Sequence, residues 1–187
     1  LVSSSAASDV YKRQLYSLKL FKIYSFNVPI IAIGNIAIGG TGKTPLTIHL
    51  SQLLSKQKIK HVIVTRGFGK KSKGTFCLEH NNNNNSFRPA DVGDEPLVIF
   101  NKIKDAPIVI DSNKVRGIKF AIKKFSPELI VLDDGFQSTY IAKNKDLVLI
   151  DISFGLKKYK LFPNGFLRDN IKSLNKSKHL IFSCKLN

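Results

Sequence analysis

The chain contains no methionine and no tryptophan, and only 2 of its 187 residues are cysteine. Cys77 and Cys184 are far apart and lack the spacing of a metal-binding cluster, which indicates reduced thiols in a cytosolic compartment. A hydrophobic run of about 18 residues, the minimum for a membrane-spanning helix, is also absent. The sequence shows no signal-peptide pattern. These absences argue against a disulfide framework, a cysteine-based metal site and a transmembrane segment.

Acidic residues are scarce, because 13 Asp and Glu stand against 30 Lys and Arg, giving a net charge of +17. No acidic residue occurs between Val10 and Leu78, whereas twelve Lys or Arg do. Such a basic half attracts polyanions, and charge by itself does not distinguish nucleic acid, an anionic membrane surface and a phosphorylated substrate. With 43% hydrophobic residues, the chain can bury one sizeable core, so one domain or slightly more is expected.

The segment from Ile33 to Pro45, I-G-N-I-A-I-G-G-T-G-K-T-P, carries the strongest motif. Its core fits the phosphate-binding pattern G-x-x-x-x-G-K-[ST], with Ala37 in the position of the first Gly. The glycines let backbone N–H groups turn toward phosphate oxygens, Lys43 reaches the β and γ phosphates, and the Thr44 hydroxyl coordinates Mg²⁺. A glycine-rich turn without a ligand is the alternative. The pattern predicts that nucleotide phosphates are bound by Ala37, Ile38, Gly39, Gly40, Thr41, Gly42, Lys43 and Thr44.

Strand and helix patterns alternate along the chain, which predicts an α/β fold. We expect a P-loop NTPase-like, mostly parallel sheet with helices on both faces. A strand before the glycine-rich loop and a helix after it place the loop at a helix N-terminus, where anions are favoured. The predicted strands are 29–33, 61–65, 107–110, 129–133, 146–150 and 179–182, and the predicted helices are 43–57, 96–104 and 113–125.

Three segments are expected along the chain. Residues 1–14 (LVSSSAASDVYKRQ) resemble a translated adapter and are interpreted as a non-native leader. Residues 15–27 are interpreted as an amphipathic membrane-proximal segment, because apolar and aromatic residues surround Lys19 and Lys22. A helix packed on the domain is the alternative for this segment. Residues 28–187 are expected to form a P-loop domain that is incomplete, with its C-terminal part missing, because a parallel strand at 179–182 should be followed by more of the fold.

Acidic residues cluster at two places where phosphate chemistry would need them. The strand pattern at 129–133 ends in Asp133 and Asp134, the form of a Walker B element whose strand-end Asp holds Mg²⁺ opposite the phosphate loop. Asp94 and Glu95 stand just before a predicted helix, with Pro96 near its first turn. Capping of that helix is therefore the alternative to a catalytic role.

Five blocks of the sequence follow one another in a family-specific order. They are G-N-I-A-I-G-G-T-G-K-T-P, T-R-G-F-G-K at 65–70, V-G-D-E-P at 92–96, L-D-D-G-F-Q at 132–137 and L-F-P-N-G-F-L-R at 161–168. Their order and approximate spacing, from about residue 15 to the C-terminus, resemble the tetraacyldisaccharide 4'-kinase (lipid A 4'-kinase) family. The resemblance implies transfer of the ATP γ-phosphate to the 4'-hydroxyl of a tetraacyldisaccharide 1-phosphate in lipid A (lipopolysaccharide) biosynthesis.

The resemblance also implies partners and a location. The acylated disaccharide phosphate is the expected substrate, and the anionic inner-membrane surface is the expected binding surface. The protein would act at the cytoplasmic face of the bacterial inner membrane, as a peripheral or monotopic protein. Neither nucleic acid nor a protein partner is expected. An anionic, acylated substrate at an anionic surface would account for the basic half of the chain.

Roles for individual residues follow from the resemblance. It implies that ATP and Mg²⁺ are the cofactors, with the ATP phosphates at Lys43 and Thr44. Asp94 would take the proton of the sugar hydroxyl, and Asp134 and Lys43 would act at the transferring phosphoryl group. Thr44 and Asp133 would hold the metal. A metal, a lysine and a carboxylate for the nucleophile are sufficient for phosphoryl transfer, which depends mainly on positioning and charge neutralisation.

Two arginines are further candidates, and the chain differs from the family pattern at two positions. Arg66 and Arg168 are weaker candidates for contact with the substrate phosphate, and a surface or structural role is the alternative for both. Ser138 stands where the family usually has His after Phe-Gln, and the family's later catalytic His has no counterpart in the chain. The chain as given is therefore expected to bind nucleotide without being a competent kinase by itself.

A basic P-loop ATPase or switch module associated with nucleic acid is the alternative from another class, motivated by the charge. The guanine-reading block N-K-x-D does not occur, because Asn144-Lys145-Asp146 lacks the intervening residue. No basic stripe interleaved with aromatic residues, as in single-strand binding proteins, stands out. A non-catalytic membrane-binding fragment is a third possibility.

Overall fold

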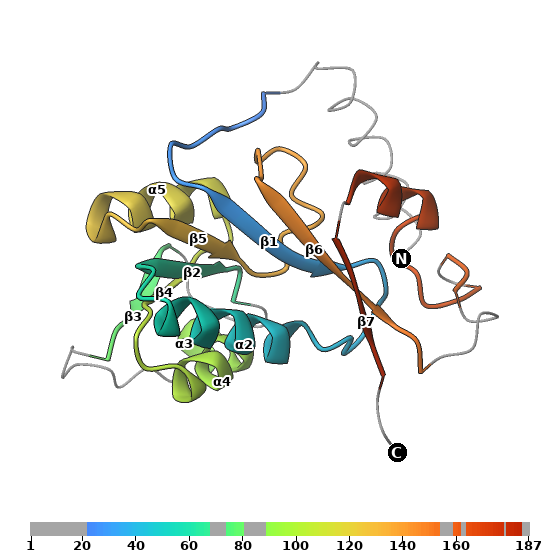
Figure 1. The fold of residues 1–187 in the computed structure, drawn as a ribbon, viewed down its shortest axis with the longest axis horizontal. Coiled ribbons are helices and arrows are strands. Elements are labelled where there is room, and N and C mark those ends of the chain that lie inside the picture. The colour runs from blue at the N-terminus through green and yellow to red at the C-terminus, as the bar shows by residue number, and fades with distance from the viewer. Residues whose placement is uncertain are drawn as a thin grey trace.

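A computed structural model describes residues 22–67, 74–80, 89–153, 159–161, 164–177 and 179–184. Within these residues, seven strands form one sheet in the order β3-β4-β2-β5-β1-β6-β7 (Figure 1). Neighbouring strands are parallel throughout, except that β3 is antiparallel to β4. The strands are β1 (Ile30–Asn35), β2 (His61–Thr65), β3 (Phe76–Leu78), β4 (Ile108–Ile110), β5 (Leu129–Leu132), β6 (Lys145–Asp151) and β7 (His179–Ser183).

Helices cover both faces of the sheet (Figure 1). In β2, Ile63 packs with Leu54 and Ile99 from helices on one face, whereas its neighbour Val62 packs with Ile118 from a helix on the other. This division follows from the alternation of side chains along a strand. The predicted fold, a P-loop-like parallel sheet with helices on both faces, is confirmed. The helices are α2 (Lys43–Lys56), α3 (Pro89–Val92), α4 (Asp94–Lys102), α5 (Lys114–Phe125) and the 3-10 helix η2 (Ile171–Lys176).

The central strand β1 positions the chemistry, because it lies between β5 and β6 and leads into the glycine-rich loop. The turn that follows β5 packs closely on its end. A Cβ built on Gly34 would lie 2.4 Å from Cβ of Phe136, a distance that real atoms do not show. Glycine at this position therefore allows the turn with Asp133 and Asp134 to approach the carboxyl end of β1.

The predicted elements are found with small shifts of their bounds. Helix α4 begins at Asp94, two residues before its predicted start, because Pro96 fits within the first turn of a helix. The sequence did not indicate β3, α3 and η2, since elements of three to six residues carry too little periodicity. Within the described residues, no helix combines the length and apolar character that crossing a bilayer requires.

Several expectations lie partly or wholly outside the described residues. They concern the leader 1–14, residues 15–21 of the amphipathic segment, and parts of the blocks at 65–70 and 161–168. The described part of the amphipathic segment is not helical. Instead, Tyr24 forms a parallel bridge with Ile141. The alternative of a helix packed on the domain is therefore wrong for residues 22–27.

Candidate active site

The glycine-rich loop between β1 and α2 forms an open cradle. Gly39 and Gly42 adopt left-handed backbone angles, with φ of 107° and 91°. Gly42 is the N-cap residue of α2, so no side chain caps the first N–H groups of this 14-residue helix. A Cβ at Gly39 or Gly40 would meet no atom within 4 Å. Uncapped N–H groups at a helix N-terminus attract anions, so the loop has the geometry of a phosphate site.

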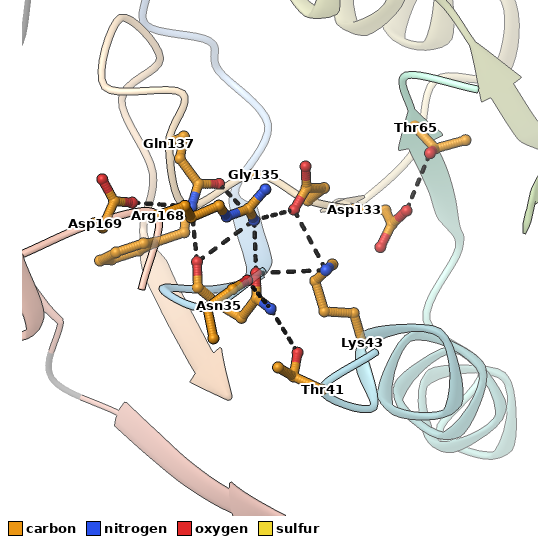
Figure 2. Close-up of polar contacts among 12 residues, drawn as sticks. Asn35, Thr41, Lys43, Thr65, Asp133, Gly135, Gln137, Arg168 and Asp169 are labelled. Carbon is orange, nitrogen blue, oxygen red and sulfur yellow. Dashed lines mark hydrogen bonds and ion pairs between the residues drawn. The ribbon is translucent and has the colours of Figure 1, made fainter. Parts of the chain in front are cut away.

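Asn35, the last residue of β1, holds this loop through its side chain (Figure 2). Its side chain is fully buried, and Nδ2 donates hydrogen bonds to Thr41 Oγ1 at 2.7 Å and to the Ala37 carbonyl at 2.9 Å. Its Oδ1 accepts from Arg168 Nη2 at 2.6 Å and from Lys43 Nζ at 3.4 Å. The sequence assigned no role to Asn35, although a polar residue that ends an apolar strand was the available signal.

Lys43 and Arg168 converge on Asp134. One oxygen of this carboxylate, Oδ1, lies 3.8 Å from Lys43 Nζ and accepts a hydrogen bond from Arg168 Nη2 at 2.7 Å. Arg168 also donates to Gln137 Oε1 at 3.1 Å (Figure 2). Burial by itself would raise the pKa of Asp134, but the charge and hydrogen bond of Arg168, with the charges of Lys114 and Lys43, hold it below its ordinary value. Asp134 therefore remains ionised between cations.

The backbone of Asp134 is also held in place. Its φ of 47° lies in the left-handed region, which costs a non-glycine residue energy and often marks a functional turn. Lys114, the first residue of α5, donates from Nζ to the Asp134 carbonyl. This lysine is 5% exposed, and burial lowers its pKa to about 8, although Asp134 and Asp133 oppose the shift. No pattern in the sequence indicated a buried lysine at this position.

Asp133 faces the other way, toward α2 and β2 (Figure 2). Its side chain is buried, and its two oxygens accept hydrogen bonds from Thr47 at 3.2 Å and from Thr65 at 3.0 Å. Burial raises its pKa to about 6, and the charge of nearby Glu95 adds to the shift. The two adjacent aspartates therefore lie in opposite electrostatic environments.

Thr44 contacts Glu95, an acid to which the sequence analysis assigned no role of its own. Its Oγ1 donates a hydrogen bond to Glu95 Oε1 at 2.5 Å, which joins the start of α2 to the start of α4. No group of three or more His, Cys, Asp or Glu that could hold a metal occurs among the described residues. Mg²⁺ commonly uses one or two carboxylates with phosphate oxygens and water. Thr44, Glu95 and Asp133 are a donor set of this kind.

Asp94 is the first residue of α4, and its side chain is exposed. The capping alternative is wrong for it, because Gly93 occupies the N-cap position, with φ of 91°. No hydrogen bond to the Asp94 carboxylate occurs within the described part of the chain, whereas the next residue, Glu95, contacts the phosphate loop through Thr44. Asp94 is thus a solvent-accessible carboxylate next in sequence to the residue that contacts the loop.

The remaining candidates differ in position. Arg66 follows β2 with an exposed side chain, near enough for its charge to help lower the pKa of Lys114. Arg168 is bound to Asp134 and Asn35. Ser138 is 5% exposed, and its backbone N–H donates to the Gly135 carbonyl, so this residue lies inside the turn after β5.

The pKa of Asp133 predicts a pH-dependent effect of Asp133→Asn. Because the pKa rises from 3.8 to about 6 on folding, the folded state binds more protons between these values. The contribution of Asp133 to stability therefore falls as pH rises through this range. As pH rises from 3.8 to about 6, the unfolding free energy of Asp133→Asn should increase relative to that of the parent, by up to about 3 kcal/mol. Urea unfolding in a chelator from pH 4 to pH 7 measures this, with Asp105→Asn at an exposed position as control. A pH-independent difference would contradict the prediction.

The fold and the loop define the protein class. It is an α/β P-loop protein whose phosphate loop, lysine and aspartates lie together at the carboxyl ends of the central strands β1 and β5. Comparison with known proteins then identifies the family. The chain belongs to the Tetraacyldisaccharide-1-P 4'-kinase family, whose model matches residues 5–187.

Individual relatives agree with this assignment. The tetraacyldisaccharide 4'-kinase of Desulfotalea psychrophila is 33% identical over 171 residues, covering 91% of this chain and 49% of the relative. That of Wigglesworthia glossinidia brevipalpis is 37% identical over 169 residues, covering 90% of this chain and 45% of the relative. The crystal structure of the "apo" form of LpxK from Aquifex aeolicus in complex with ATP has a TM-score of 0.85 at 30% identity, covering 95% of this chain and 55% of that one. The chain spans about half the length of the curated relatives it matches.

Proposed function

We propose that the chain is the ATP-binding part of a lipid A 4'-kinase, which transfers the γ-phosphate of ATP to the 4'-hydroxyl of a tetraacyldisaccharide 1-phosphate. One observation carries the proposal beyond family membership. Lys43 from the phosphate loop and Arg168 from a distant segment meet at Asp134, and both also donate to the buried Asn35 Oδ1. Phosphoryl transfer requires positive charge at this position, because negative charge spreads over the transferring group.

The loop and its surroundings fit ATP and Mg²⁺. The N–H groups at the start of α2 and the ammonium of Lys43 would bind the phosphates, while Thr44, Glu95 and Asp133 would hold the metal. The metal would neutralise charge on the phosphates when bound. Asn35 keeps the loop in shape, since it bonds to both Thr41 and Ala37.

Asp94 is the proposed base toward the acceptor. As the 4'-hydroxyl oxygen forms its bond to the γ-phosphorus and the bond to ADP breaks, the hydroxyl proton would pass to the Asp94 carboxylate. Exposure at the first residue of α4 leaves this carboxylate accessible to a bulky acceptor. Arg66, exposed at the end of β2, is the proposed contact for a phosphate of the substrate.

The partners and location are part of the same proposal. The substrate would be the acylated disaccharide phosphate, met at the cytoplasmic face of the inner membrane by a peripheral or monotopic protein. The charge of +17 supports binding to an anionic surface. Charge would equally support nucleic-acid binding, but the family assignment favours the lipid substrate.

The direct test is transfer of label from γ-labelled ATP to the disaccharide by a form with the full length of the curated relatives. Nucleotide binding by the 187-residue chain is measured in parallel with a fluorescent ATP analogue. We expect Mg²⁺-dependent labelling of the lipid at its 4'-position. Salt-dependent DNA binding with no lipid phosphorylation would instead favour the nucleic-acid ATPase.

Thr44→Ala should raise the Mg²⁺ concentration needed for half-maximal nucleotide binding by about 10-fold or more. The variant removes the hydroxyl that bonds to Glu95 and that we assign to the metal. A Mg²⁺ titration with the fluorescent analogue measures the change in the chain itself. Thr44→Ser retains the hydroxyl and is the matched control, so it should stay close to the parent. An unchanged Mg²⁺ requirement in Thr44→Ala would refute the assignment.

A further inference from the structure

A groove lies between residues 22–27 and the exposed side of α5, and none of its lining residues belongs to the candidate active site. Its volume is about 520 Å³. In Figure 1 the extended segment that precedes β1 passes alongside α5, which forms the other wall. Lys22, Lys119 and Lys123 line the groove together with Ile23, Phe26 and Ile122. No acidic residue is among its lining residues.

The positive charge of this groove is not compensated within the described structure. Two other cations of α5 form ion pairs, Arg116 with Asp111 at 2.7 Å and Lys124 with Glu79. Lys119 and Lys123, in contrast, are exposed and form no ion pair among the described residues. They are four residues apart on one helix face, an arrangement that destabilises a helix when both carry the same charge. An anion held by these lysines and Lys22 would relieve that repulsion.

The apolar part of the groove favours a lipid over a nucleic acid. Ile23 is 47% exposed, so an aliphatic side chain is available beside the lysines. The aromatic side chains are occupied: Lys22 Nζ lies 5.3 Å from the centroid of the Tyr24 ring, and Phe26 packs on the core formed by β1, β2 and α5. Nucleic acids bind such basic grooves by stacking bases on free aromatic faces. An anionic group attached to aliphatic chains matches this lining better.

The orientation of α5 connects the groove with the active site. The helix begins at Lys114, which contacts Asp134, and its 12 residues extend for about 18 Å. A flat surface lying along α5 would therefore contact the groove and also approach the turn of Asp133 and Asp134. We propose that the groove binds the anionic headgroup of a bilayer phospholipid and orients the active site along the membrane. The orienting role rests on the proposed function, whereas headgroup binding does not require it.

Vesicle binding without ATP or disaccharide tests headgroup binding separately from kinase activity. The triple variant Lys22→Gln, Lys119→Gln, Lys123→Gln is compared with the parent on phosphatidylcholine vesicles with and without phosphatidylglycerol. The matched control removes three exposed lysines on the other face, Lys56, Lys102 and Lys104. Lysines near an anionic surface contribute enough that losing three should weaken binding about 100-fold. The control variant should bind the vesicles nearly as tightly as the parent. Equal loss in both variants, or no loss in the first, would overturn the proposal.

A fluorescent reporter gives a second measurement, because the chain contains no tryptophan. Ile23→Trp should shift its emission to shorter wavelength on phosphatidylglycerol vesicles and be quenched by brominated acyl chains. Leu53→Trp, at a 44% exposed position on α2, should do neither. Inorganic phosphate and a single-stranded oligonucleotide are tested as competitors. Displacement from the groove by the oligonucleotide, or an equal response to phosphate alone, would show another ligand class and overturn the proposal.

Discussion

Lys43→Ala is expected to lower phosphoryl transfer by about 10²–10³-fold in the full-length form, the usual loss when one preorganised charge-stabilising donor is removed. The ammonium of Lys43 lies between Asn35 Oδ1 and Asp134 Oδ1, at the mouth of the loop. Its removal takes positive charge from the β and γ phosphates without changing the apolar core. Initial rates with saturating disaccharide measure the effect, and binding of the ATP analogue to the chain should also weaken.

Lys56→Ala is the matched control, because it removes the same side chain from the other end of α2. It should retain nearly the parent rate. Circular dichroism and thermal unfolding should show an unchanged fold for both variants. A near-normal transfer rate in Lys43→Ala would mean that the glycine-rich loop does not bind the transferred phosphate.

Asp94→Asn is expected to lower kcat by about 10²–10⁴-fold, the contribution of a general base, while nucleotide affinity changes little. The Asp94 carboxylate is exposed and forms no hydrogen bond within the described residues, so it is available to an acceptor hydroxyl. Asn keeps the size and polarity of the side chain but cannot take the proton. Steady-state kinetics with both substrates and direct ATP binding separate the two effects.

The neighbouring acid gives a contrasting control. Glu95 bonds to Thr44, so Glu95→Gln should change the Mg²⁺ requirement, as Thr44→Ala does, rather than kcat alone. If Asp94→Asn retained a normal kcat, Asp94 would have no role as a base. If Asp94→Asn and Glu95→Gln had the same profile, both acids would belong to the metal site.

The central elements could be predicted because their signals are local. Runs of apolar β-branched residues predicted the strand before the phosphate loop and the strand after α2. The motif predicted that Lys43 and Thr44 lie at the start of α2. Short elements such as β3 carry no comparable signal. The capping alternative for Asp94 was wrong by one position, because Gly93 is the N-cap residue of α4 and Asp94 is its first helical residue. Sequence patterns locate helix ends less well than helix interiors.

The order of the elements, the phosphate loop and the excess of positive charge could be read from the amino-acid sequence, because each depends on neighbouring residues or on composition. The contacts between side chains of the site come from the tertiary structure. Arg168 reaches Asn35 across 133 positions, and Thr44 reaches Glu95 across 51. It also separated the two adjacent aspartates: burial raises the pKa of Asp133, and cations lower that of Asp134. Such contacts depend on which strands lie side by side, and no local pattern specifies that order.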